Sequence, residues 1–142
     1  MKPFIYLAPL LLLVACDGTK LPIVISNSCS IDQPILNSAL PAGKSFKVGG
    51  WAYDKQSGVL PKQVRIQLTS TNRQVSKTFE ATLGLERKDV AQALNAPNAR
   101  LSGFISEVPA KSIAPGVYEI VVLQDMPNAM WACGNGHTIQ VK

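Results

Sequence analysis

The sequence predicts an all-β fold, a sandwich of about seven strands with one short helix, over residues 45–142. Apolar residues alternate with polar ones over short stretches, most clearly at Val64, Ile66 and Leu68. Glycine, proline and asparagine residues separate these stretches, and β-branched residues are frequent within them. A small closed barrel of strands is the main alternative.

The first half of this domain is expected to form three strands. Residues 46–53 have an extended pattern, and Gly49-Gly50 within them indicates a bulge or a close approach of another backbone. Trp51 is expected to fill the core between the sheets. Residues 64–69 form the clearest half-buried strand, and residues 75–83 are expected to return beside it as a hairpin partner.

In the second half, the spacing of apolar residues changes from that of a strand to that of a helix over one segment. Val90, Ala91 and Leu94 are spaced as one face of a helix over residues 88–94. Gly134-Asn135-Gly136 is expected to form a tight hairpin between two late strands. The extended segments expected in this half are residues 101–108, 117–123, 131–133 and 138–141.

Composition is typical of a globular protein and argues against nucleic-acid binding. Hydrophobic residues make up 46% of the chain and charged residues 16%, so there is enough apolar surface to build a core. The formal net charge is +5, but the basic residues are scattered singly instead of clustering on one element with stacking aromatic residues. We therefore expect no nucleic-acid partner.

Residues 1–15 have the pattern of a secretory signal peptide. Lys2 supplies a positive charge, and residues 4–14 form an apolar stretch too short to span a bilayer. The stretch ends in Leu13-Val14-Ala15-Cys16, which resembles the lipobox of bacterial lipoproteins. There a diacylglycerol is attached to the cysteine thiol, and the signal peptidase cleaves before this residue. An ordinary signal peptide, the alternative, favours a small residue in place of the leucine. We therefore expect lipidation of Cys16.

This resemblance implies that the mature chain lies at the cell envelope. Paired acyl chains on Cys16 satisfy the two-signal requirement for stable membrane anchoring. Asp17 resembles the signal that retains lipoproteins in the inner membrane of enteric bacteria. A periplasm-facing location at the inner membrane is therefore favoured, and the outer membrane is the alternative. Residues 16–44 are expected to form a lipidated tether and an irregular arm, with a short edge strand at Ile23-Val24-Ile25.

Cys29 and Cys133 remain as an even pair, and we expect them to form a disulfide in an oxidising compartment. The bond would close a loop of about 100 residues, which contributes about 4–5 kcal/mol in the chain-entropy description. Two buried free thiols are the alternative. A metal site is disfavoured, because His137 is the one further ligand nearby and a Cys-x3-His pair alone is a weak signal.

An ordered series of short motifs covers residues 46–123. It comprises Gly50-Trp51-Ala52-Tyr53-Asp54, Arg87-Lys88-Asp89-Val90-Ala91, Ser102-Gly103-Phe104 and Pro115-Gly116-Val117-Tyr118. The series resembles accessory β-sandwich domains of bacterial membrane-associated and cell-envelope proteins, whose pattern runs G-W-A-x-D, R-x-D-V-A, G-F and P-G-x-Y. The resemblance implies an immunoglobulin-like or fibronectin-like fold and no established catalytic role.

The charged residues of these motifs have two interpretations. In the first, they determine the fold: Asp54 bonds backbone amides in a turn, and Asp89 favours the start of the helix. In the second, Asp54, Arg87 and Asp89 line a groove for a sugar or a peptide. The first interpretation is favoured, because turns and helix starts commonly use these residue types.

The sequence contains no recognisable catalytic, cofactor-binding or metal-binding constellation. His137, the single histidine, lies in a glycine-rich turn, no G-x-S-x-G segment offers a nucleophile, and the acidic residues are dispersed. We therefore expect a non-catalytic, lipid-anchored envelope protein that binds a protein or glycan partner as an accessory module, without a cofactor. The alternative is a periplasmic inhibitor or immunity lipoprotein against a wall-degrading enzyme. A hydrolase with an unfamiliar site is the third and weakest hypothesis.

Overall fold

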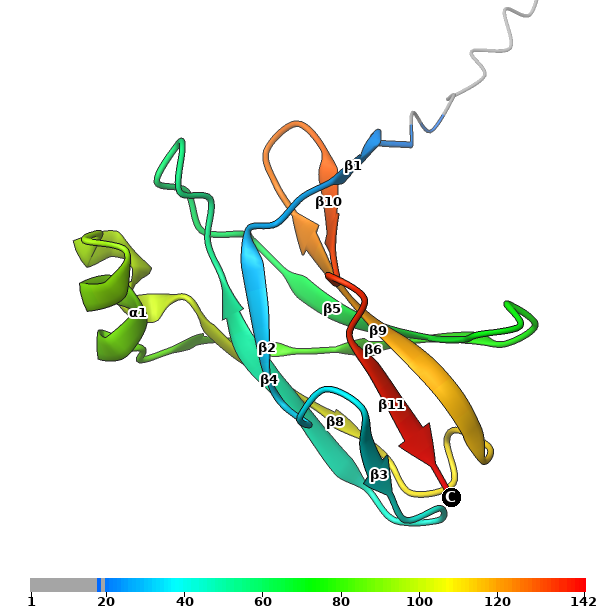
Figure 1. Ribbon diagram of the computed structural model, residues 1–142. Coiled ribbons are helices and arrows are strands. Elements are labelled where there is room, and N and C mark those ends of the chain that lie inside the picture. The colour runs from blue at the N-terminus through cyan, green and yellow to red at the C-terminus, as the bar shows by residue number, and fades with distance from the viewer. Residues whose placement is uncertain (1–17, 19) are drawn as a thin grey trace, which may run out of the picture.

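The computed structural model describes residues 18 and 20–142, which form a mostly β structure of two sheets with one short α-helix (Figure 1). Cys16 and Asp17 lie outside the described residues. In chain order the elements are β1 (Ile23–Ile25), β2 (Cys29–Gln33), β3 (Ser38–Leu40), β4 (Phe46–Ala52), β5 (Val64–Ser70), β6 (Ser76–Glu80), β7 (Thr82–Leu85), α1 (Lys88–Ala93), the 3-10 helix η1 (Pro97–Leu101), β8 (Gly103–Val108), β9 (Gly116–Asp125), β10 (Met130–Cys133) and β11 (Thr138–Val141).

The seven-stranded sheet is organised by β9, the longest strand described. β5 pairs antiparallel with one side of β9, and β6 lies outside β5 as its hairpin partner. On the other side, β10 pairs with the C-terminal half of β9 and β11 with its N-terminal half. β1 and β3 complete this edge, because they pair in parallel with β10 and β11 respectively.

The four-stranded sheet has the order β2-β4-β8-β7, and a glycine allows its first two strands to pair. A Cβ atom on Gly50 would lie 1.9 Å from the carbonyl oxygen of Ser30 in β2, so no larger residue fits there. Opposite this glycine, the register of β2 shifts between Ile31 and Gln33. The close backbone approach that Gly49-Gly50 predicts is present, and the irregularity in register lies in the partner strand β2 and not at the two glycines.

The core lies between the two sheets, where alternate residues of each strand face inward. Transfer of each large side chain from water contributes about 1.5–3 kcal/mol, which makes this the main source of stability. The inward-facing residues of the central strands are Val48 and Ala52 of β4, Val64, Ile66 and Leu68 of β5, Phe104 and Val108 of β8, and Tyr118, Ile120 and Val122 of β9. The predicted two-sheet, sandwich-like architecture is thus confirmed.

A second, smaller core lies beneath α1 and η1, which project from one side of the sandwich (Figure 1). Tyr53, Val90 and Ala99 are buried there, and Trp51 packs against them. The expectation that Trp51 fills the core between the sheets is wrong. Ala52 takes the inward-facing position of β4, so alternation directs Trp51 to the outer face of the sheet.

The N-terminal arm is more regular than its composition indicates. Between residues 23 and 40 it contains β1, β2 and β3, each paired with a strand of the main body, so the sandwich begins before residue 45. The serine-rich, asparagine-rich sequence predicted an irregular arm, but an edge strand buries little surface and tolerates such residues. In β2, Cys29 and Ile31 supply the small inward-facing surface that is needed.

The tight hairpin predicted at Gly134-Asn135-Gly136 does not form. β10 and β11 both run antiparallel to β9, so they follow one another along the same edge instead of pairing with each other. The turn between β10 and β11 interrupts the row of residues that pairs with β9. This turn passes close to β9, because a Cβ atom on Gly134 would lie 2.9 Å from the carbonyl oxygen of Ile120. The segment at residues 75–83 is also divided, because β6 belongs to one sheet and β7 to the other.

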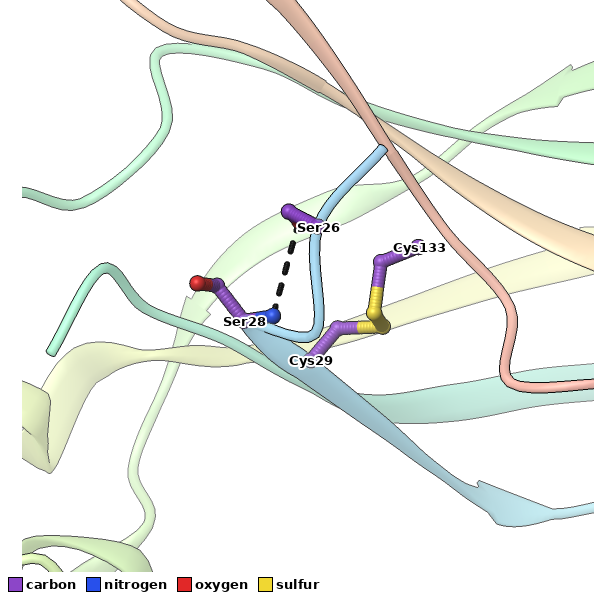
Figure 2. Close-up of a disulfide and its surroundings, with 4 residues drawn as sticks. All are labelled: Ser26, Ser28, Cys29 and Cys133. Atoms are coloured by element: carbon purple, nitrogen blue, oxygen red, sulfur yellow. Dashed lines mark hydrogen bonds between the residues drawn. A yellow bond between two sulfur atoms is a disulfide. The ribbon is translucent and has the colours of Figure 1, made fainter. Parts of the chain in front are cut away.

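The predicted disulfide between Cys29 and Cys133 is present and joins the two sheets. Figure 2 shows the two side chains meeting between the start of β2 and the end of β10. Their Cα atoms are 6.1 Å apart, and both residues belong to the buried core. Beside the bond, the amide of Ser28 donates a hydrogen bond to Oγ of Ser26 at 3.5 Å, within the turn that leads from β1 into β2.

We predict that replacing both cysteines, Cys29→Ala with Cys133→Ala, lowers the free energy of unfolding by about 2–5 kcal/mol, because the unfolded chain is no longer constrained over 104 residues. Urea denaturation measures this change. The reduced wild-type protein should unfold at a urea concentration close to that of the double variant. A loss below about 1 kcal/mol would contradict a structural role for the bond.

Candidate functional site

Arg87 is the centre of a charged cluster that joins two parts of the chain, the start of α1 and strand β2. Its Nε and Nη2 atoms donate hydrogen bonds to the two carboxylate oxygens of Asp89, at 2.9 and 2.7 Å. Its Nη1 atom donates to Asp32 of β2 at 2.6 Å. In this forked pairing each of the three guanidinium nitrogens has a carboxylate partner. Arg87 therefore ties the start of α1 to the edge of the four-stranded sheet.

A glycine provides the space in which Arg87 lies. A Cβ atom on Gly103 would be 2.9 Å from Cγ of Arg87 and 2.6 Å from the carbonyl oxygen of Leu85. The glycine of the G-F motif and the arginine of the R-x-D-V-A motif are therefore neighbours, and a side chain at position 103 would displace the arginine.

The same outer face of the four-stranded sheet carries a hollow of about 320 Å³ beside Arg87. Its floor lacks side chains at Gly49 and Gly103, and the side chain of Gln33 lies close to Gly49. The remaining lining residues include Asp32, Leu85, Glu86 and Ile105. The hollow thus combines hydrogen-bonding groups with a small apolar surface, a mixture that suits a polar ligand or an extended peptide.

The ion pairs shift the protonation equilibria of the cluster. Hydrogen bonds from the Arg87 guanidinium lower the pKa of Asp89 from its ordinary value of 3.8 to about 2. The same contacts, of which that with Asp89 is the strongest, raise the pKa of Arg87 above its ordinary value. Asp89 is largely exposed, so solvent screening keeps the effect of this pair on stability small.

Asp54, the third residue of the predicted groove, lies elsewhere. Its Oδ1 atom accepts a hydrogen bond from the Gln56 amide at 3.0 Å, and its Oδ2 atom accepts one from the Ser57 hydroxyl. Its backbone closes the same turn through the amide of Gly58 at 2.8 Å. Asp54 borders the hollows near Trp131 and not the one beside Arg87. These contacts are those of a turn residue.

Tyr118 shows how the P-G-x-Y motif acts. Near the start of β9, its hydroxyl donates a hydrogen bond to the carbonyl oxygen of Ala114 at 2.6 Å, and its ring is buried in the core. The bond holds the chain where it turns into β9. The four motifs thus have structural contacts at their most distinctive residues.

The single histidine lies at the sheet edge. Nε2 of His137 is 2.7 Å from the carbonyl oxygen of Pro34, so the ring joins the turn after β2 to the segment before β11. Its neighbour in the Cys-x3-His pattern, Cys133, is occupied by the disulfide. Within the described part of the chain, no group of three or more histidine, cysteine or acidic residues is arranged to hold a metal ion.

Sequence reasoning missed Asp32, a member of the charged cluster, and Gln33, which lines the hollow beside it. No signal could have found them, because Asp32 lies 55 positions before Arg87 and reaches it only through the pairing of β2 with β4. Compared with known proteins, the chain matches no protein-family model and no curated protein sequence. Over residues 18 and 20–142, no helix is long and apolar enough to cross a membrane.

We predict that Arg87→Gln raises the pKa of Asp89 from about 2 toward its ordinary value of 3.8. The folded-state pKa is lowered, so the stabilising contribution of this carboxylate is present above the ordinary pKa of 3.8 and is lost as the pH falls through about 2. A ¹³C NMR titration of the side-chain carboxyl groups measures the shift. Arg87→Lys, which keeps the charge but not the fork, should give an intermediate value. An unchanged titration of Asp89 would contradict the pairing.

Proposed function

We propose that this protein is a non-catalytic, lipid-anchored protein of the bacterial cell envelope, in which the sandwich serves as a binding or accessory module. The observation that carries the proposal is the buried disulfide between the sheets, since such bonds form and persist in oxidising compartments outside the cytosol. Export then requires a leader, and residues 1–15 with Cys16 supply the pattern of a lipoprotein leader.

The environments of the polar groups support a non-catalytic role. Each nitrogen of the Arg87 guanidinium bonds a carboxylate, and the His137 ring is hydrogen-bonded to a backbone carbonyl. An activated nucleophile needs a general base within hydrogen-bonding reach, and among the described residues no hydroxyl or thiol is hydrogen-bonded to the His137 ring. These contacts instead resemble those that hold a rigid binding domain together.

The finer fold assignment is also a proposal: we infer that the sandwich is immunoglobulin-like. The order β2-β4-β8-β7 corresponds to strands A, B, E and D of that fold, and β5, β9 and the β10–β11 edge correspond to C, F and G. Tyr118 supports this assignment, because a tyrosine at the start of strand F that bonds the preceding backbone is a hallmark of such domains. The disulfide differs, since it joins the A and G positions instead of B and F.

We predict that Cys16→Ser abolishes membrane anchoring. The wild-type protein should be recovered with membranes and carry the mass of acyl groups on its N-terminal residue, whereas the variant should be recovered in the soluble fraction. The matched control is the Cys29→Ala, Cys133→Ala variant, which should stay with the membrane because it keeps Cys16. Mass spectrometry of the mature N-terminus decides the question. A processed wild-type chain without an acyl group would overturn the proposed anchor.

We predict that the hollow beside Arg87 is where the module meets its partner. Gly49→Val should fill it at little cost, because the nearest atom to the new Cβ is the flexible Gln33 amide nitrogen at 3.0 Å. Mild crosslinking in intact cells, followed by purification, should recover an envelope protein or glycan with the wild type and markedly less with Gly49→Val. Lys47→Leu, on the same face of β4, is the control. Equal recovery from all three would contradict a role for the hollow.

A further inference from the structure

The most exposed aliphatic side chains near the N-terminus gather on one strand. Ile25 is 83% exposed, Ile23 65%, Leu21 51% and Val24 41%. We call these four residues the N-terminal edge patch. They lie on or beside β1, the outermost strand at one edge of the seven-stranded sheet, where the described chain begins in Figure 1.

More apolar surface lies along the same edge. Ile35 is 75% exposed and Leu36 is 51% exposed. They lie in the turn that leads from β2 into β3, and β3 occupies the same edge as β1. Native edge strands are usually protected by charged side chains, yet β1 carries none. Exposed aliphatic residues gathered at one edge indicate a surface that is covered in use.

We propose that the N-terminal edge patch docks the sandwich against the surface of the lipid bilayer. The proposal rests on the anchor at Cys16 proposed above. Leu21 stands five positions after Cys16, and an extended chain spans at most about 3.5 Å per residue. Leu21 is therefore held within about 18 Å of the lipid-bearing residue, and Ile25, nine positions after Cys16, within about 32 Å. At these distances, contact with the membrane requires no search through solution.

The chemistry around the patch suits a bilayer interface. Lys20 directly precedes it, and Lys55 borders a hollow of about 390 Å³ together with Val24, Ile25 and Trp131. Lysine, tryptophan and aliphatic residues are the side chains that proteins place at the level of the lipid headgroups. The lysines would meet anionic headgroups while the isoleucines enter the boundary with the acyl chains.

The structure favours a lipid surface over a partner strand added to β1. Strand addition gains affinity from a row of backbone hydrogen bonds, and β1 is three residues long. So short an edge offers few such bonds, whereas its side chains are unusually exposed. Insertion into a bilayer interface uses the exposed side chains of β1 and does not require a long row of free backbone groups.

Trypsin cleavage after Lys20 tests the proposal, because docking would shield this exposed residue. The acylated full-length protein is placed in vesicles of phosphatidylethanolamine and phosphatidylglycerol, and release of the sandwich is followed over time. Ile23→Asp with Ile25→Asp should accelerate release by about tenfold, which corresponds to a loss of about 1.4 kcal/mol of docking free energy. Ile25→Asp alone, which changes the most exposed side chain, should act in the same direction even if the double variant folds poorly.

Leu101→Asp is the matched control, since Leu101 is 53% exposed but lies on η1 beside the other sheet. It should be released at the wild-type rate. Equal rates for wild type, Ile25→Asp and the double variant, with an acylated chain, would overturn docking and leave the anchor intact. A chain without acyl groups would overturn the anchor and the docking together.

A photo-crosslinking residue distinguishes the possible occupants of the patch. Placed at position 25 of the acylated protein in cells, it should form phospholipid adducts at about ten times the level seen at position 101. Adducts with another protein, or with a second copy of this chain, would overturn the proposal in favour of a protein interface. No excess of lipid adducts at position 25 would overturn it as well.

Discussion

Face-to-face packing of the two sheets is the constraint on which the remaining structure depends. Each strand can bury only every second side chain, so the inner faces must be apolar and in register at the same time. Ile66 of β5 and Ile120 of β9 meet this requirement from one sheet, and Phe104 of β8 from the other. Once these faces are joined, the outer faces are fixed too, and the position of each polar cluster follows.

The charged cluster around Arg87 is a consequence of this packing. Phe104 must face inward, so its neighbour Gly103 faces outward, and the missing side chain there leaves room for the stem of the arginine. Gly50 similarly lets β2 approach β4, which brings Asp32 to within 2.6 Å of the guanidinium. Two glycines, selected by strand geometry, therefore assemble a cluster whose members are distant in sequence.

Local patterns predicted what local physics determines. The alternation at residues 64–69 and the helical spacing at 88–94 each led to the correct element, because each depends on nearby residues, and the even number of remaining cysteines predicted their pairing without any local pattern. The prediction for Trp51 was wrong because it followed the size of the side chain. The alternation of β4 places Trp51 on the outer face of the sheet. Which residues of a strand face inward depends on how the strand pairs, and its pairing partners lie elsewhere in the chain.

Long-range pairing accounts for the other differences. The polar composition of β2 and β3 gave little indication of strands, because these segments are held by partners outside their own stretch of sequence, β2 by β4 and β3 by the much later β11. The turn at residues 134–136 has the composition of a hairpin, yet β9 is long enough to pair with both β10 and β11. No short stretch of sequence contains that information. The partner of Arg87 at Asp32 was hidden for the same reason.

The position of the disulfide also determines how the domain would respond to mechanical load. Cys29 is the first residue of β2 and Cys133 is the last residue of β10, so the bond joins the two sheets close to where the chain enters the sandwich. A pull on the N-terminal side would detach β1, which is three residues long, and would then reach a covalent link. The disulfide then distributes the force over both sheets, so the hydrogen bonds between β2 and β4 do not break one after another. The segment before Cys29 would extend under strain while the folded body keeps its shape.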